Sequence, residues 1–248
     1  MPRFKIHIQY DGTSFHGWQI QKNNRTIQGE LETVLIKLNN GNKINVIGSG
    51  RTDSGVHALD QVAHFDWETN MESCEIVSAM NGNLPPEIRV KTCQLVPNVF
   101  HARFSAVQRQ YLYLCRTDDY IMDRHTVWNT GPLDIEVLNS MSKTLIGEHD
   151  FTSFSKYNPE VENRVCIIYL SEWTEAESIV NYRVAANRFL HHMVRYLAGT
   201  MIQAANGKLT MTDFQNLLNQ PEKDVQVYRA PARGLFLEYI DYNGADTF

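Results

Sequence analysis

One order of predicted secondary structure elements occurs twice along this chain, and this duplication limits its possible folds more than any other feature. Hydrophobic periodicity and turn residues predict strand, helix, strand, strand, helix, strand in the first half. The second half starts the same order again and ends on a strand. We therefore expect two halves of related architecture.

The first half begins with apolar residues that alternate with polar ones between Phe4 and Tyr10, a pattern typical of a half-buried strand. Asp11-Gly12 then turns the chain. The other elements expected in this half are a helix over 27–38 with Thr26 as N-cap and Asn40-Gly41 as stop, strands over 44–49 and 61–67, a helix over 72–80, and a strand over 88–95.

The second half has the corresponding signals, with an additional short helix. The expected elements are a strand over 110–116, a helix that carries Leu138, Met141 and Leu145 and stops at Gly147, strands over 165–173 and 179–186, helices over 190–205 and 213–218, and a strand over 235–242. The segment 150–154 is interpreted as a polar and aromatic loop without assigned chemistry.

Both halves fit the split βαβ, or ferredoxin-like, pattern βαββαβ. We predict an α+β fold in which two such halves form a continuous central antiparallel sheet, with helices on one face and a cleft between the halves. The expected domains are 1–103 and 104–248, a boundary that follows from the duplication because no low-complexity linker separates them. A length of 248 residues with 43% hydrophobic content is sufficient for such a core.

Charge and apolar patterning narrow the function classes. The chain has neither a long apolar stretch nor a basic start followed by an apolar segment, so we expect a cytoplasmic protein that does not enter the membrane. A net charge of -5 argues against coating nucleic acid through total charge. However, 101–116 and 181–196 each contain three arginines and no acid. Brought together, they would make a basic, aromatic-rich groove for a phosphate backbone; scattered surface arginines are the alternative.

The ten residues GSGRTDSGVH at 48–57 are the most unusual local motif. They lack the Lys-Ser/Thr pair of a P-loop, and Asp53 occupies a position where a Rossmann fingerprint needs glycine. Arg51 lies two residues before Asp53, so on extended backbone it is expected to pair with the carboxylate and keep it ionised. Such a carboxylate can act as nucleophile or base, and an ordinary turn is the alternative interpretation.

Three other features were weighed for chemistry. Tyr111 and Tyr113 share one face of a predicted strand, either as sheet core or as a base-stacking platform. Arg195 lies near a buried helix face, where it needs an anionic partner such as Asp53, a phosphate or a structural carboxylate. His191-His192 are adjacent and would diverge on a helix, so no metal site is predicted.

Several stretches together resemble a known family: YDGTSFHGWQIQ, GSGRTDSGVHALDQVAHF, FHARFSAVQRQYLY, GEHDFTSF, NRFLHHMVRYLAG and ARGLFLEYIDY. They occur in the same order, across almost the whole chain, as in the TruA family of tRNA pseudouridine synthases. The resemblance implies isomerisation of uridine to pseudouridine at positions 38 to 40 in the anticodon stem-loop of tRNA. It also implies a homodimer that uses no metal or cofactor.

By this resemblance Asp53 is the catalytic aspartate, and Arg51 pairs with it and helps to displace the target base. Tyr111 stacks on the uracil, and Arg195 is a second arginine near the aspartate. The substrate-binding set thus contains Tyr111, Arg51, Arg195, Leu235 and Leu237, the two leucines forming the apolar wall of the uracil pocket.

Some questions stay open at this level. Ser54 and Arg188 depart from the family pattern, which leaves the choice of uridines open. The carboxylate of Asp53 has three available roles: attack on C1′, attack on C6, or removal of a sugar proton. The glycines of the motif are interpreted as room for RNA to approach the backbone. The alternatives are a non-catalytic tRNA-binding module and a glycosidic hydrolase, which would need a second carboxylate.

Overall fold

The computed structural model describes residues 1–225 and 227–245, and the chain divides into two compact units. Unit 1 comprises Met1–Val107 and the C-terminal segment from Phe236, and unit 2 comprises Gln108–Leu235. The expected domains, 1–103 and 104–248, stay predictions; in this division the C-terminal strand belongs with the N-terminal unit. Within unit 1, that strand pairs with an N-terminal strand, and the Val107 N–H donates to the Asp241 carbonyl at 2.9 Å.

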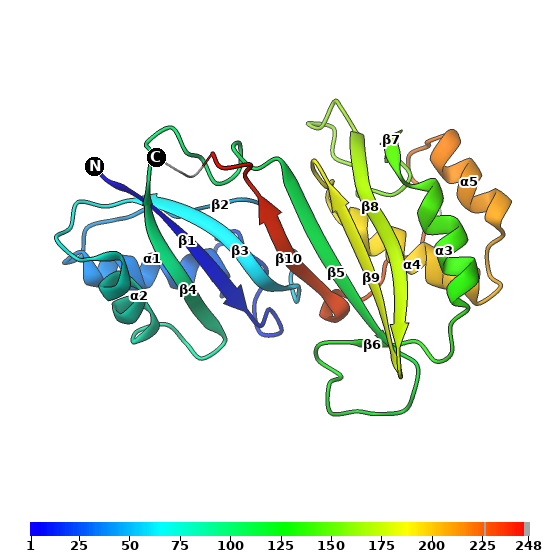
Figure 1. The fold of residues 1–248 in the computed structure, drawn as a ribbon, viewed down its shortest axis with the longest axis horizontal. Helices are drawn as coiled ribbons and strands as arrows, with labels where there is room; N and C mark the ends of the chain where they lie inside the picture. Colours follow the sequence, from blue (N-terminus) through cyan, green and yellow to red (C-terminus); the bar gives the residue numbers. More distant parts are fainter. Residues whose placement is uncertain (226, 246–248) are drawn as a thin grey trace. The chain divides into compact units, whose positions relative to one another are not determined.

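Unit 1 contains a sheet with two helices on one face (Figure 1). Its elements are β1 (Arg3–Tyr10), α1 (Ile27–Leu38), β2 (Ile47–Gly48), β3 (His57–Asp66), α2 (Ser73–Asn81) and β4 (Ile88–Val96). β1 pairs antiparallel with both β3 and β4, and β2 pairs antiparallel with β3. The expected βαββαβ order of the first half is therefore confirmed.

Helix α1 forms where the sequence predicts it, for local reasons. The Thr26 side chain accepts a hydrogen bond from the Gly29 N–H and caps the first turn. The residues expected on its inner face are buried: Ile27, Leu31, Val34 and Leu35. Asn40 and Gly41 then have φ values of 51° and 88°, a left-handed conformation that ends the helix.

Two strands of unit 1 differ from their predicted bounds. Ile44 and Val46 are buried as expected, but β2 is only Ile47–Gly48. The buried Glu32 carboxylate accepts from the Val46 N–H at 3.0 Å and so replaces a strand partner. β3 begins at His57, four residues before the predicted start at 61, because the C-terminal strand pairs in parallel with its first residues.

Unit 2 contains the remaining helices, of which α3 and α5 lie beside β7 in Figure 1, together with the strands from β5 onward. Its elements are β5 (Gln108–Arg116), β6 (Trp128–Asn129), α3 (Ile135–Thr144), β7 (Gly147–Asp150), β8 (Val165–Ala176), β9 (Ile179–Ala186), α4 (Met193–Ala205), α5 (Met211–Asn219) and the 3₁₀ turn η1 (Ala232–Gly234), followed by the start of β10 (Leu235–Asp241). The antiparallel order is β5, β9, β8, β7.

Helix α4 begins at Met193 and not at the predicted residue 190. His192 has φ of 65°, which places it outside the helix. As a result the rings of His191 and His192 lie against each other, tilted by 38°, with centroids 3.9 Å apart. The expectation that these two side chains diverge was therefore wrong, because it assumed helical backbone at both positions. The strand β7 was also missed, in a segment interpreted as a helix stop and loop.

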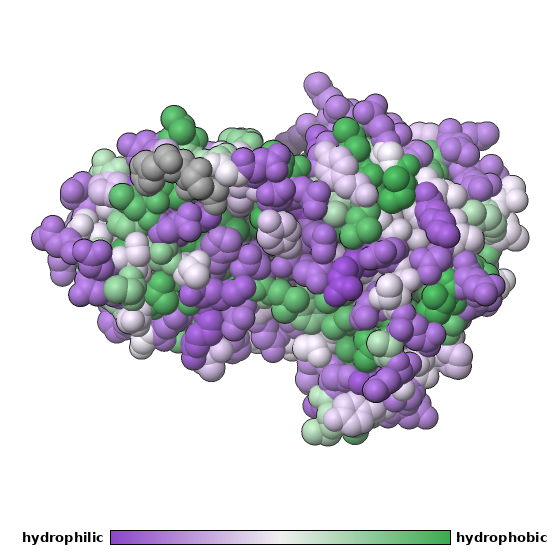
Figure 2. Space-filling view, in the orientation of Figure 1, coloured by the Kyte–Doolittle hydropathy of each residue, from purple (hydrophilic) through white to green (hydrophobic). Residues whose placement is uncertain are grey.

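The prediction of an α+β fold with a mostly antiparallel sheet is confirmed. A sheet that continues through both halves and a cleft between them stay predictions. Among the described residues, no helix combines the length and apolarity needed to cross a bilayer. The face of the molecule in Figure 2 is largely hydrophilic, with small separated hydrophobic areas.

The segment that follows β4 is fastened to the sheet of unit 1 by side chains of β1 and β3. Arg3 donates to the carbonyls of Asn98 and Phe100 at 2.7 and 2.8 Å, and its Nε donates to Asp66 at 2.7 Å. The buried His64 ring accepts at Nδ1 from the Ala102 N–H at 3.1 Å. His64 must therefore be neutral, with its proton on the other ring nitrogen.

This neutral histidine predicts a loss of stability in mild acid. Burial, with smaller contributions from Arg3 and His101, lowers the pKa of His64 from 6.5 to about 4. The pKa of His64 in the folded protein lies below its value in the unfolded chain. The contribution of neutral His64 to the free energy of unfolding is therefore complete above about pH 6.5 and is lost as the pH falls towards 4. A shift of this size corresponds to roughly 3 kcal/mol of unfolding free energy.

Urea unfolding of the parent and the His64→Gln protein between pH 7 and 4.5 tests this expectation. Glutamine keeps an acceptor for the Ala102 N–H but has no proton to gain, so its stability should depend less on pH. His101 and Asp66, whose pKa values are also lowered, titrate in both proteins, and His64 makes only a minor contribution to the lowered pKa of Asp66, so most of their effect is common to the two proteins. If the free energy of unfolding depended on pH equally in the two proteins, the assignment of a neutral, buried His64 would be contradicted.

Candidate functional site

The loop that carries the motif residues, 49–56, leaves β2 and enters β3, and the side chain of Gln61 holds its first residues. The Ser49 hydroxyl donates to the Gln61 side-chain oxygen at 2.7 Å, and the Gln61 amide donates to the Gly50 carbonyl at 3.1 Å. The Ser49 N–H donates to the Val62 carbonyl at 2.8 Å. The loop therefore starts from a defined position on the sheet.

The segment 10–18 forms the floor beneath this loop. The Tyr10 hydroxyl and the Thr52 hydroxyl share a buried hydrogen bond of 2.8 Å, and burial raises the pKa of Tyr10 to about 12. The Trp18 N–H donates to the Thr52 carbonyl at 3.1 Å. The Phe15 carbonyl accepts from the Gly55 N–H at 3.2 Å. Hydrogen bonds on both sides of residue 53 thus connect the loop backbone to the floor.

Two glycines permit this close packing of backbone on backbone. Gly17 has φ of 87°, and a Cβ on it would lie 2.6 Å from the Thr52 carbonyl oxygen. A Cβ on Gly48 would lie 2.6 Å from the Trp18 indole. Gly50, in contrast, has no atom within 4 Å of its Cβ position. Packing against Trp18 thus explains the glycine at 48. The prediction that the glycines leave room for RNA to approach the backbone applies best to Gly50.

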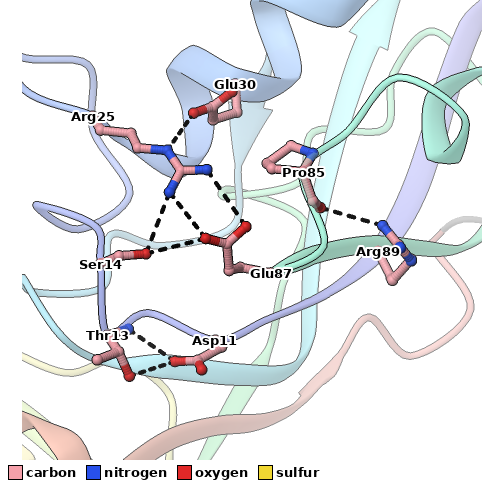
Figure 3. A network of polar contacts seen from close by, with 8 residues as sticks. All are labelled: Asp11, Thr13, Ser14, Arg25, Glu30, Pro85, Glu87 and Arg89. Atoms are coloured by element: carbon pink, nitrogen blue, oxygen red, sulfur yellow. Dashed lines mark hydrogen bonds and ion pairs between the residues drawn. The ribbon is translucent and has the colours of Figure 1, made fainter.

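An ion-pair network fastens the floor segment to its surroundings (Figure 3). Arg25 donates to Glu30 at 2.6 Å and to Glu87 at 3.1 Å, and its guanidinium lies 4.3 Å from the centroid of the Phe15 ring. The hydrogen bond from Arg25 lowers the pKa of Glu87, so this carboxylate stays ionised at neutral pH. Ser14 also donates to Glu87, at 3.5 Å. The floor is therefore tied to α1 and to the residue before β4.

Asp53 lies at the turn of the loop. Its side chain is partly exposed, while Arg51 is exposed. The pairing of Arg51 with Asp53 stays a prediction. The Val56 N–H donates to the Asp53 carbonyl at 3.1 Å and Gly55 has φ of 77°, so the chain turns here and is not an extended strand.

Two of the other predicted site residues occupy β10. Leu237 is buried in unit 1, where it pairs with Ala58 of β3, five residues after Asp53. The first residue of β10, Leu235, is buried and belongs to unit 2. Unit 1 therefore brings Asp53, Arg51 and Leu237 onto one framework.

Unit 2 contains the predicted aromatic and the second arginine. Tyr111 on β5 is half-buried and makes an edge-to-face contact with Phe189, with centroids 5.1 Å apart. Tyr113 is fully buried and its hydroxyl donates to the Pro231 carbonyl at 2.8 Å, so it is a core residue. Arg195 is 9% exposed in the first turn of α4, and its Nε donates to the Ala230 carbonyl at 2.8 Å.

Comparison with known proteins decides the family. A family model described as tRNA pseudouridine synthase matches residues 6–105 and 141–243. The chain belongs to this family. It is 38% identical over 245 residues to tRNA pseudouridine synthase A of Bacillus subtilis (strain 168), covering 97% of this chain and 99% of that protein. It is also 38% identical over 244 residues to tRNA pseudouridine synthase A of Chlorobium phaeovibrioides, covering 98% of this chain and 100% of that protein.

The family match includes the motif loop, the floor segment, Arg195 and both leucines, while Tyr111 lies in the stretch between the two matched ranges. Among solved structures, one titled "Crystal Structure of a Cbf5-Nop10-Gar1 Complex" has a TM-score of 0.35 and 13% identity, covering 92% of this chain and 56% of that chain. That likeness is too remote to carry an argument.

Sequence reasoning missed the residues that support the loop. Tyr10, Thr52 and Gly17 hold the backbone around Asp53, but the sequence interpretation assigned them no role. The available signal was the stretch YDGTSFHGWQIQ, which carried the resemblance without a physical explanation. The packing of the floor segment against the loop gives a physical explanation for the glycines and aromatic residues of this stretch.

Proposed function

We propose that Asp53 is the catalytic carboxylate of this protein, and that its target uridines lie at positions 38 to 40 in the anticodon stem-loop of tRNA. Membership in the family makes the protein an isomerase that converts uridine to pseudouridine in tRNA. The observation that supports Asp53 is its position: a partly exposed carboxylate on a loop held from both sides, inside the matched range.

The reaction needs a carboxylate but no second reactant. The bond between C1′ and N1 of uridine breaks, the uracil rotates while it is held, and a new bond forms between C1′ and C5. The hydrogen on C5 leaves as a proton and N1, freed from C1′, takes up a proton, so atoms and charge balance without a cofactor. An ionised Asp53 serves as nucleophile or base in each of the three open variants. The target base must leave its stack to reach a protein side chain.

The remaining site residues receive roles that follow from the resemblance and fit their surroundings. Arg51, exposed beside Asp53, helps to displace the base and pairs with the carboxylate when RNA is bound. Tyr111 stacks on the uracil, and Leu235 and Leu237 form the apolar wall of its pocket. Arg195 acts near the aspartate with the guanidinium nitrogens other than Nε, which donates to the Ala230 carbonyl.

Phosphate binding is assigned to the two acid-free stretches, with two exceptions. Arg116 donates to Asp118 at 2.9 Å and to Asp123 at 2.8 Å, so its charge is compensated. Arg195 is buried and is assigned to the aspartate, so the remaining arginines of these stretches are the candidates for the RNA backbone. Both halves of the chain would serve one tRNA site, with 1–103 carrying the catalytic loop. The expected protein is a cytoplasmic homodimer that uses no metal or cofactor.

Mapping of pseudouridine in unmodified tRNA transcripts after incubation with the purified protein tests the proposal. We expect pseudouridine at positions 38 to 40 and no free uracil. A transcript with cytidine at these positions serves as the control and should stay unmodified. Binding of tRNA without pseudouridine would favour the non-catalytic module, and free uracil would favour hydrolysis. Pseudouridine outside the anticodon stem-loop would contradict only the positions.

A further inference from the structure

A second surface of unit 1, at the turn 101–104, displays an aromatic ring to solvent. Phe104 is 76% exposed, although phenylalanine is usually buried. A single exposed apolar residue is common and needs no explanation by itself. Phe104 differs from that ordinary case in its rigid support and in its charged and aromatic neighbours.

The backbone that carries Phe104 is held rigidly. The Nδ1 atom of His101 accepts from the N–H groups of both Arg103 and Phe104, each at 3.2 Å. His101 and Ser105 are joined by two hydrogen bonds, of 2.9 and 3.0 Å. Ala102, between them, is held at its N–H by His64 and at its carbonyl by the Tyr242 hydroxyl at 2.7 Å. The ring is thus presented on a turn that is already ordered, which reduces the entropy cost of binding a partner.

The neighbours of Phe104 match the chemistry of nucleic acid. One neighbour is the His101 ring, whose centroid lies 4.4 Å from that of Phe104 at an interplanar angle of 32°. The exposed Arg103 guanidinium lies 5.6 Å from the Phe104 centroid. The sequence 97–116 contains no acidic residue, and Asp66, on the adjoining end of β3, is bound by two nitrogens of Arg3. An aromatic face beside a cation, on a segment of the chain that contains no acidic residue, favours a base and its phosphate over an apolar protein surface.

We propose that Phe104 and Arg103 form a second RNA contact, in which a base stacks on the Phe104 ring and Arg103 binds the adjacent phosphate. The proposal rests on the proposed function, because it takes tRNA as the ligand. The turn adjoins the end of β3 at His64, whereas the Asp53 loop precedes its start at His57. Seven residues of strand correspond to roughly 23 Å, so this contact would hold RNA beyond the displaced nucleotide.

Measurement of tRNA affinity in the Asp53→Asn background tests the contact without interference from turnover. Loss of one stacked base should weaken binding by about 5- to 100-fold in the Phe104→Ala protein. The Phe104→Tyr protein keeps the ring and should bind within about threefold of its parent. Tyr239→Ala is the matched control, because it removes another exposed aromatic of unit 1, at 47% exposure, and should leave affinity unchanged. Thermal melting verifies that all variants fold.

Fluorescence distinguishes stacking from indirect loss of binding. In the Phe104→Trp protein, tRNA should quench emission beyond the quenching seen in the parent, whose Trp18, Trp67 and Trp173 are buried and whose Trp128 is half-buried. Unchanged affinity of Phe104→Ala, or the absence of extra quenching, would overturn the proposal. Dissociation of an oligomer by Phe104→Ala in sedimentation would also overturn it, since the partner would then be a second copy of the chain.

The outcome is separable from the proposed function. If the parent protein forms no pseudouridine while Phe104→Ala still weakens tRNA binding, the stacking contact stands and the catalytic proposal fails. If the parent forms pseudouridine and Phe104→Ala binds tRNA normally, only the stacking contact fails.

Discussion

Substitution of Asp53 by asparagine is expected to reduce pseudouridine formation to background. Asparagine keeps the size of the side chain and its preference for turns, but it lacks the negative charge needed for nucleophilic or base chemistry. The loop should keep its shape, because hydrogen bonds of its backbone and of the Thr52, Ser54 and Gln61 side chains hold it. Release of tritium from tRNA labelled at uridine C5 measures the reaction directly.

Affinity separates loss of chemistry from loss of binding in this variant. We expect the Asp53→Asn protein to bind tRNA within about tenfold of the parent, roughly 1.4 kcal/mol, by filter binding. A turn former without catalytic function would tolerate asparagine well, and activity would persist. Near-normal tritium release from a folded Asp53→Asn protein would therefore refute the assignment of this loop.

The second large effect is expected from Gly17→Ala, at a residue that contacts no substrate in the proposed mechanism. The new Cβ would lie 2.6 Å from the Thr52 carbonyl oxygen and 3.1 Å from the Asp53 carbonyl carbon, at a backbone φ of 87° that alanine adopts poorly. Both atoms are backbone, so the loop itself has to move. We expect a loss of about 2 to 4 kcal/mol in unfolding free energy.

Displacement of the Asp53 backbone should also slow the reaction. A shift of the catalytic group by about 1 Å is enough for a loss on the order of 100-fold in turnover. Gly41→Ala is the matched control, because Gly41 has a similar φ of 88° but no atom within 4 Å of its Cβ position. It should lose only about 1 kcal/mol of stability and keep full activity. Parent-like turnover in the Gly17→Ala protein would show that the floor does not position Asp53.

Elements with local causes were predicted well from the sequence. Helix α1 is an example, since its N-cap, its buried face and its stop all lie within the same sixteen residues of chain, 26–41. β9 was also predicted with its observed bounds, Ile179–Ala186. In both elements the hydrophobic period and the flanking turn residues agree, so no distant partner is needed to define the ends.

Elements that depend on distant partners were predicted less well. β2 is short because the Val46 N–H donates to the carboxylate of Glu32, fourteen residues earlier in the chain, and not to a neighbouring strand. The early start of β3 depends on pairing with Phe236 and Leu237, from the other end of the sequence. Neither partner leaves a periodic signal near the strand that it alters.

For the candidate site, the sequence by itself determined the motif residues to which a role is proposed and the family that these motifs indicate. Asp53, its glycines and the ordered motifs were all identifiable without coordinates, because side-chain type and spacing are local properties. The tertiary structure decided how that chemistry is held. It showed a floor of backbone hydrogen bonds under the loop, close packing of Gly17 against that loop, and a C-terminal strand in the N-terminal unit. These features depend on contacts between residues far apart in the chain, and such contacts form only when the whole chain folds.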